Sequence, residues 1–294
     1  MKYLILPDVH KTTIWKNHIA KYFDTVDHVY FLGDYFDSHS EDCLTDEEAV
    51  QNFLEIVELK KTYPEKVHLC IGNHDVHYLY GASACSGYNR GSAEAIRKAL
   101  VDNLEHTSLA YLVPGLVWNN QPVVVSHAGV SKVWYSKAVK ALVKDAETDD
   151  AELLVQKVNE LYQMLVLLQK DIANDSENTE KLCTAGITMA TLDFPYNCFD
   201  PYGDDPICPP TWIRPNSLFA SALFSNQIVG HTSLAEDSAC FYRICIGEDT
   251  TNIVFVDSVE HDLALLLDSD ATYEWQTLMA KEKQPEDLID LDAD

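Results

Sequence analysis

The stretch VHLCIGNHDV, residues 67 to 76, ends an apolar run with polar residues that a buried strand does not need. Residues 67 to 71 are typical of a short buried strand. The tetrapeptide GNHD (72–75) follows at once and offers a flexible backbone position and three polar side chains. One such tetrapeptide is weak evidence of a site, so its meaning depends on whether other strands end in the same way.

The first hundred residues alternate between strand and helix patterns. The apolar run 3–6 precedes a segment, 12–23, whose apolar residues have helical spacing. The segment VDHVYFLGDYFD (26–37) is again strand-like, and a capping-box pattern at 45–48 opens a second helix. Ser92 is a candidate N-cap for a third helix. This alternation predicts an α/β fold in which helices cover the sheets.

The rest of the chain adds further strands around a helical region. An amphipathic helix is predicted at 149–173 and interpreted as packing on the main body. Residues 174–216, rich in Pro, Asn, Asp and aromatics, predict a long irregular excursion. We expect one domain over 1–267, with a helical and irregular excursion at about 137–216, and an acidic tail at 268–294. Strand-like runs occur at 109–118, 122–126, 227–229, 240–246 and 252–257.

Composition and charge exclude several classes of protein. The 294-residue chain has a formal net charge of −26 and eight cysteines without a C-x-x-C pair. The charge argues against nucleic acid as a partner, and the cysteine spacing argues against a disulfide scaffold or structural zinc. No apolar run approaches the roughly 18 residues of a membrane span, and MKYLIL meets Pro7 too early for a signal peptide. We therefore expect a cytoplasmic protein without a membrane partner.

Polar clusters also follow other predicted strands. Strand ends at the edge of an α/β sheet are where such folds collect binding groups. Carboxylate, imidazole and amide oxygen together suit hard or borderline divalent metals, and a shared carboxylate allows two ions about 3.5–4 Å apart. Each cluster alone is more often surface chemistry, but five in order indicate a metal centre. They are Asp8 and His10 in PDVH, Asp34 and Asp37 in GDYFD, Asn73 and His74 in GNHD, His127 in SHAG, and His231 in GHTS.

These motifs resemble those of the calcineurin-like metallophosphoesterases, and the match runs over residues 8–232. The resemblance implies a two-sheet β-sandwich flanked by helices. It also implies two divalent metal ions at the sheet edge, with manganese expected first and iron, zinc or nickel as alternatives. The resemblance assigns Asp8 and His10 to the first metal, Asp34 to both as a bridge, and Asn73, His127 and His231 to the second.

The chain departs from the wider family at two positions. Ser233 stands where many members have a second metal-binding His in G-H-x-H. This departure resembles the branch of the PPP-type Ser/Thr protein phosphatases and the bacterial symmetrical diadenosine tetraphosphatases, and HAGVSKVW (127–134) resembles a run in the latter group. Both groups usually carry a phosphate-binding Arg where this chain has Ser38. We therefore expect a loop arginine to bind the substrate phosphate, Arg214 in WIRP first and Arg90 in SGYNRGS second.

The family resemblance implies hydrolysis of phosphate esters by direct attack of a metal-bridging hydroxide, without a covalent intermediate. His74 is expected to protonate the leaving group, because Asp37 can pair with its imidazolium and orient the ring. Asp75 is interpreted as a turn or capping group. The histidines without a motif role, including His39 and His77, are interpreted as structural or surface residues.

Several substrates stay open at this point. The first expectation is a phosphoprotein, as for a Ser/Thr protein phosphatase-like phosphomonoesterase, and the alternative enzyme is a dinucleoside polyphosphate hydrolase. A catalytically inactive binding protein on the same fold is the alternative from another class. Inactive copies are expected to lose ligands, and none is lost here. The oligomeric state is left open.

Overall fold

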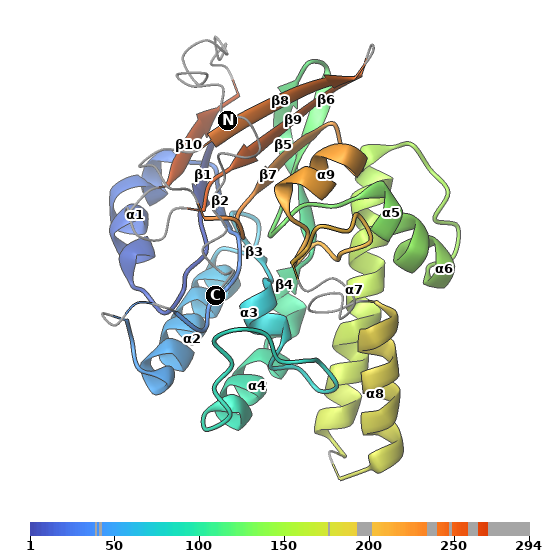
Figure 1. The fold of residues 1–294 in the computed structure, drawn as a ribbon. Helices are drawn as coiled ribbons and strands as arrows, with labels where there is room; N and C mark the ends of the chain where they lie inside the picture. The colour runs from blue at the N-terminus through green and yellow to red at the C-terminus, as the bar shows by residue number, and fades with distance from the viewer. Residues whose placement is uncertain are drawn as a thin grey trace.

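Two five-stranded sheets pack face to face, with helices on their outer sides (Figure 1). The computed structural model describes residues 1–38, 40, 43–175, 177–192, 202–233, 240–246, 249–257 and 264–269. His39 and the predicted acidic tail from residue 270 onward lie outside the described residues. The arrangement confirms the predicted α/β fold class, a two-sheet sandwich flanked by helices.

The first sheet combines four parallel strands with one antiparallel strand at its edge, in the order β10-β1-β2-β3-β4. Parallel strands bring their carboxyl ends to one edge of a sheet. The loops that carry PDVH, GDYFD and GNHD therefore lie next to one another. The strands are β1 (Lys2–Leu6), β2 (His28–Phe31), β3 (Val67–Cys70), β4 (Thr107–Ser108) and β10 (Leu265–Asp268).

The second sheet has the order β5-β6-β7-β9-β8, in which β6, β7 and β9 are mutually parallel. The predicted turn between β5 and β6 contains Asn119 and Asn120, whose φ values of 49° and 60° suit a tight hairpin turn. The predicted strand at 252–257 begins earlier, at Asp249. The strands are β5 (Ala110–Trp118), β6 (Gln121–Ser126), β7 (Asn226–Val229), β8 (Cys240–Ile246) and β9 (Asp249–Phe255).

Strand β1 illustrates why its sequence, KYLIL, is apolar almost without interruption. Tyr3 and Ile5 point into the space between the two sheets, where they pack with residues of the second sheet. Leu4 and Leu6 point to the other side, where they join the core beneath the helices. Because successive side chains of a strand face opposite ways and both faces of this sheet are covered, neither set is exposed.

The helices begin largely where the sequence predicts. Thr45 and Glu48 form the predicted capping box at the start of α2. Asp150 caps α7, whose predicted range was 149–173. Two short 3₁₀ helices, Phe23–Thr25 and Leu104–His106, and one π-helical segment, Tyr135–Val139, connect other elements. The helices are α1 (Ile14–Tyr22), α2 (Asp46–Thr62), α3 (Asn73–Val76), α4 (Ala93–Val101), α5 (Lys132–Trp134), α6 (Lys140–Leu142), α7 (Ala151–Ala173), α8 (Thr179–Thr191) and α9 (Pro215–Ser221).

The predicted irregular excursion at 174–216 was wrong for its first part, because α8 occupies it. The side chain of Asn178 caps α8 by accepting hydrogen bonds from the backbone of Glu180 and Lys181. Ala185 and Met189 are buried on one face of the helix, beside α7 (Figure 1). Tertiary packing of this face thus stabilises a helix that the local composition does not indicate.

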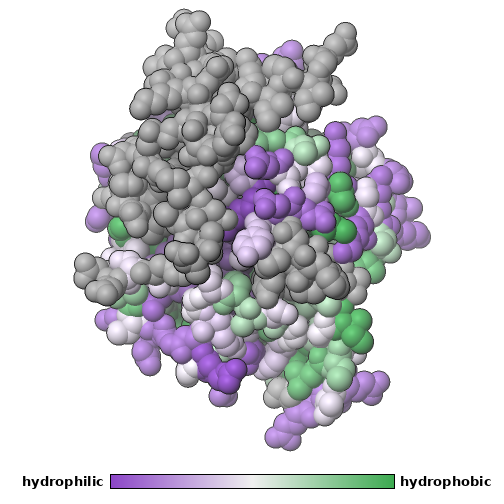
Figure 2. All heavy atoms as spheres, viewed as in Figure 1, coloured by the Kyte–Doolittle hydropathy of each residue, from purple (hydrophilic) through white to green (hydrophobic). Residues whose placement is uncertain are grey.

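The surface over α7 and α8 exposes apolar side chains in spite of the acidic composition. Leu167 on α7 and Ile187 on α8 are each 69% exposed. Figure 2 shows apolar side chains, in green, over this lower right region of the molecule. Among the helices that the structure describes, none has the length and hydropathy to cross a membrane.

Candidate metal centre and acid–base pair

The predicted metal ligands come together at the edge where strands of both sheets end. Asp8 follows β1, Asp34 follows β2, and Asn73 begins α3 after β3. His127 follows β6 and His231 follows β7 in the second sheet. All five side chains are buried. Segments far apart in the sequence therefore supply one buried polar centre.

His127 and His231 each turn one ring nitrogen toward the amide oxygen of Asn73, and the other nitrogen of each ring contacts a backbone carbonyl. His127 Nδ1 lies 2.9 Å from Leu32 O, and His231 Nε2 lies 3.2 Å from Trp212 O. Because a carbonyl oxygen only accepts, each of these nitrogens carries the ring proton. The remaining nitrogens, His127 Nε2 and His231 Nδ1, each lie 3.0 Å from Asn73 Oδ1. Three lone-pair atoms that face one another in a buried site fit a bound cation.

Burial keeps both imidazoles neutral, which is the form that binds a metal. Burial lowers the pKa of His127 to about 3 and lowers the pKa of His231 well below its ordinary value. For both rings the loss of hydration is the largest cause. Neither ring needs to release a proton before it can coordinate a cation.

Asp34 belongs to two groups of possible ligands. Its Oδ2 atom lies 3.5 Å from His127 Nε2 on one side and 3.8 Å from His10 Nε2 on the other. Asp8 Oδ2 lies 4.0 Å from His10 Nε2. The ligand atoms of Asp8, His10 and Asp34, and those of Asp34, His127 and His231, lie within 4.8 Å of one another. This sharing suits a carboxylate that bridges two metal ions.

The carboxylates are crowded in a way that a divalent cation would relieve. Burial, with the charges of Asp8 and Asp75 nearby, raises the pKa of Asp34 well above its ordinary value. Glycines permit the crowding, since a Cβ at Gly72 would overlap Asp34 Oδ1 and one at Gly230 would overlap Asp8 Oδ1. The donor set of carboxylates, imidazoles and an amide oxygen therefore fits two divalent cations.

Several site residues have a backbone conformation that L-residues rarely adopt. The φ values are 41° for His10, 50° for Asp34, 60° for Asp37 and 65° for His231. Such conformations cost about 1–3 kcal/mol each and persist only where the surrounding structure enforces them. Their concentration at these strand ends is a sign of function independent of the side-chain chemistry.

His74 and Asp37, which were predicted to be an acid–base pair, lie in contact beside the candidate metal ligands. His74 Nδ1 lies 3.1 Å from Asp37 Oδ2, and both residues are buried. Burial alone would raise the pKa of Asp37, but hydrogen bonds from His74, His77 and Tyr78 outweigh it and lower the pKa. The His74 ring stands edge to face with His10, with 5.3 Å between the ring centroids. Asp37 is therefore ionised and contacts the His74 ring, which in turn contacts His10 of the first group of candidate ligands.

Asp75 joins two of the site loops. Its Oδ2 atom accepts from the backbone N–H of Gly72 and of Asp34, each at 2.9 Å, and its Oδ1 atom accepts from Tyr35 at 2.8 Å. This is the capping role expected from the sequence. The buried carboxylate holds GNHD against GDYFD, so it acts on the site through the backbone.

The two candidate phosphate-binding arginines differ in position. Arg214 is buried, and its Nη1 atom donates to His231 O at 3.2 Å and lies 3.5 Å from Thr232 Oγ1. Arg90 is exposed, and within the described part of the chain no hydrogen bond or ion pair joins it to the metal ligands. The structure thus brings Arg214, but not Arg90, to the centre.

Three residues near the candidate site were not predicted from the sequence. Asp257 is buried two residues beyond β9, and its Oδ2 atom accepts from Ser233 Oγ at 3.0 Å. The pattern of an Asp after an apolar strand, as in VFVD, was a signal for it. His77 and Tyr78 both lie against Asp37, and no sequence pattern marks them.

A sequence model of the family described as calcineurin-like phosphoesterase matches residues 1–186. No curated protein matches the chain. One similar solved structure is a protein serine/threonine phosphatase from Saccharomyces cerevisiae with similarity to human phosphatase PP5, at 19% identity and a TM-score of 0.31. The match covers 44% of this chain and 38% of that chain, and a likeness this partial adds nothing to the assignment.

Proposed function

We propose, from the premise that this chain belongs to the calcineurin-like phosphoesterase family, that it is a metal-dependent phosphomonoesterase of the Ser/Thr protein phosphatase type. The family match confirms the predicted family and supports the predicted class of enzyme, a hydrolase. The single observation that carries the proposal is the position of Asp34. It is shared by two groups of metal ligands, directly beside the His74–Asp37 pair.

The proposed ligands divide between two cations. Asp8, His10 and Asp34 would hold one, and Asp34, Asn73, His127 and His231 the other. Bound divalent ions supply an activated water and neutralise charge on the phosphoryl oxygens. Manganese is the first choice because the donors are oxygen and nitrogen atoms without a thiolate, and iron, zinc and nickel are alternatives.

Residues of the chain would donate the proton to the leaving group and stabilise the negative charge of the phosphoryl group. Asp37 orients His74 through Nδ1, so that Nε2 can give a proton to the departing oxygen. The Arg214 guanidinium is fixed by the His231 carbonyl and would stabilise negative charge on the phosphoryl group. In this proposal the contacts of His74 with Asp37 and of Arg214 with the His231 carbonyl would limit the reorganisation that the reaction requires.

The proposed substrate is a phosphorylated protein. Ser233 stands where other branches of the family have a histidine, and it supports membership in the group that contains both the protein phosphatases and the diadenosine tetraphosphatases. The net charge of −26 disfavours nucleic acid. The expected cytoplasmic location stays a prediction, and so does the alternative of a dinucleoside polyphosphate substrate.

Metal analysis and a substrate panel test this proposal. The purified protein, supplied with manganese, is expected to bind two ions per chain and to hydrolyse para-nitrophenyl phosphate and a phosphoserine or phosphothreonine peptide. Elemental analysis and phosphate release measure the two properties. Activity on diadenosine tetraphosphate alone would favour the nucleotide hydrolase. Bound metal without turnover of any phosphoester would favour the inactive binding protein.

Arg214→Ala is expected to keep both metals and to lower kcat/KM about 10²–10³-fold, about 3–4 kcal/mol, because one preorganised donor to the transition state is removed. Steady-state kinetics with para-nitrophenyl phosphate measures the loss. Arg90→Ala is the matched control and should retain nearly all activity, since Arg90 is exposed. A large loss in Arg90→Ala with a normal Arg214→Ala would reverse the assignment.

A further inference from the structure

We propose that His77 and Tyr78 are positioning residues that hold the Asp37 carboxylate in the one orientation in which it can serve His74. The inference rests on the proposed function, because it assigns a task to residues around the acid–base pair. His77 was expected to be a structural or surface residue, and that expectation does not account for its contacts with Asp37 and Cys85.

One turn of chain brings three polar side chains to one carboxylate, two of them, His74 and Tyr78, through hydrogen bonds. His77 Nε2 lies 2.7 Å from Asp37 Oδ2, the same oxygen that lies 3.1 Å from His74 Nδ1. The Tyr78 hydroxyl donates to Asp37 Oδ1 at 2.6 Å. His77 and Tyr78 stand three and four residues after His74, a spacing that places side chains on the same face of a helix.

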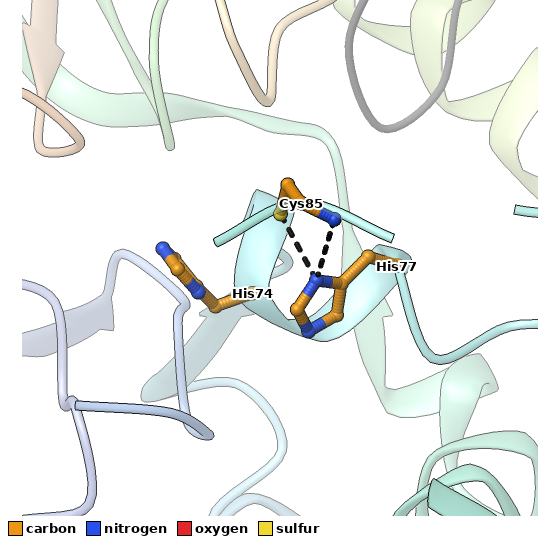
Figure 3. Close-up of side chains that lie close together, drawn as sticks. All are labelled: His74, His77 and Cys85. Atoms are coloured by element: carbon orange, nitrogen blue, oxygen red, sulfur yellow. Dashed lines mark hydrogen bonds between the residues drawn. The ribbon is translucent and has the colours of Figure 1, made fainter. Parts of the chain in front are cut away.

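Cys85 determines which His77 nitrogen carries the proton. Its backbone N lies 3.4 Å from His77 Nδ1 and its Sγ 2.9 Å (Figure 3). A backbone N–H can only donate, so Nδ1 accepts and the ring proton is on Nε2, toward Asp37. Figure 3 shows both contacts ending on one ring nitrogen while the other points away from Cys85. The Nε2 proton of His77 is therefore on the side of Asp37, where Nε2 lies 2.7 Å from Oδ2, although the N–H is not aligned with that oxygen.

A contact from the loop before α4 likewise determines the direction of the Tyr78 hydroxyl proton. The backbone N–H of Asn89 donates to the Tyr78 hydroxyl at 3.1 Å, which leaves the hydroxyl proton for Asp37. Gly87, at a φ of 77°, packs on Asp37 so closely that a Cβ would come within 2.9 Å of Asp37 Cβ. Loop 82–91 thus covers the carboxylate and sets the direction of its donors.

A metal site is the alternative interpretation of the cluster formed by His74, His77 and Cys85. His74, His77 and Cys85 have possible ligand atoms within 4.8 Å of one another, and thiol with imidazole suits a soft cation. However, His74 Nδ1 faces Asp37, and His77 Nδ1 already accepts from the Cys85 backbone. One nitrogen of each ring is thus engaged within the chain, so we assign the cluster to the surroundings of Asp37.

The expected consequence concerns the leaving group. When a carboxylate has fixed donors on both oxygens, it cannot rotate away from His74, and the His74 ring stays aimed at the departing oxygen. A basic leaving group depends on that proton, whereas an activated one departs almost unaided. Phenyl phosphate, whose phenol has a pKa near ~10, and para-nitrophenyl phosphate provide this contrast.

Three variants test the proposal. His77→Leu removes the donor, His77→Gln keeps an N–H near the Nε2 position, and Tyr78→Phe removes only the hydroxyl. We expect His77→Leu and Tyr78→Phe to lower kcat for phenyl phosphate ~10–100-fold, the range typical of an outer partner of a site residue, with full metal content. The loss with para-nitrophenyl phosphate should be several-fold smaller, and His77→Gln should recover most of the activity. His106→Leu, outside the site, is the control and should match the wild type.

Equal losses with both substrates, or equal defects in the Leu and Gln variants, would assign His77 to packing and overturn the inference. Tyr78→Phe keeps the ring volume, so it tests the inference even if His77→Leu folds poorly. A wild-type protein that binds metal but hydrolyses neither substrate would instead overturn the proposed function, and the inference with it.

Discussion

Asp34→Asn is expected to release both metal ions and to reduce turnover to background. Among the described residues, Asp34 is the one shared by both ligand groups, so its loss removes a negative ligand from each at once. The amide can still accept the hydrogen bond that His74 N donates to Asp34 Oδ1, so the loop should keep its shape. Elemental analysis of the purified variant and an assay with para-nitrophenyl phosphate measure the two effects.

Asp102→Asn is the matched control, because Asp102 is an exposed carboxylate that pairs only with Lys98 among the charges described. It should keep both ions. An Asp34→Asn protein that retained two ions would show that Asp34 is not the bridge.

The metal-free protein offers a second readout of the same substitution. The pKa of Asp34 is raised in the folded state, so its ionised form opposes folding. This cost is absent below the ordinary value of 3.8 and grows as the pH rises toward the folded-state pKa. At neutral pH, Asp34→Asn should therefore raise the melting temperature of the metal-free protein. A lowered melting temperature would show that the crowding of carboxylates is not destabilising.

The sequence predicted those parts of the fold that depend on local patterns. The apolar run of β1, the capping box at Thr45 and Glu48 and the turn at Asn119 each follow from the residues themselves. Helix α8 was missed because its stability depends on contacts of Ala185 and Met189 and not on local composition. Elements whose stability depends on tertiary packing could therefore not be predicted from local sequence patterns.

The same distinction between local patterns and tertiary contacts applies to the candidate site. The motif residues were predictable because each directly follows a strand, and parallel strands bring their ends together. The contacts of His77 and Tyr78 with Asp37 were not predictable, because they join segments that are distant in the sequence. The choice between Arg214 and Arg90 needed the path of the loop before α9, which places Arg214 against His231.

His74→Asn should separate the chemistry from metal binding. The substitution removes the ring that would protonate the leaving group, but the backbone N–H of residue 74 still donates to Asp34 Oδ1. We therefore expect two bound metals and a kcat lowered ~10²–10⁴-fold, the usual contribution of a general acid. Elemental analysis and kinetics on the protein as purified measure both quantities.

The dependence on the leaving group decides what the loss in His74→Asn means. If His74 is the acid, the loss should be large with phenyl phosphate and much smaller with para-nitrophenyl phosphate, whose leaving group needs little protonation. Variants of His77 should show the same dependence at smaller amplitude, because they act through Asp37. A His74→Asn protein as depleted of metal as Asp34→Asn would make His74 a ligand, which would contradict the acid assignment. With metal retained, an equal loss on both substrates would limit His74 to binding the phosphate, because proton donation is the only one of its tasks that distinguishes the two leaving groups.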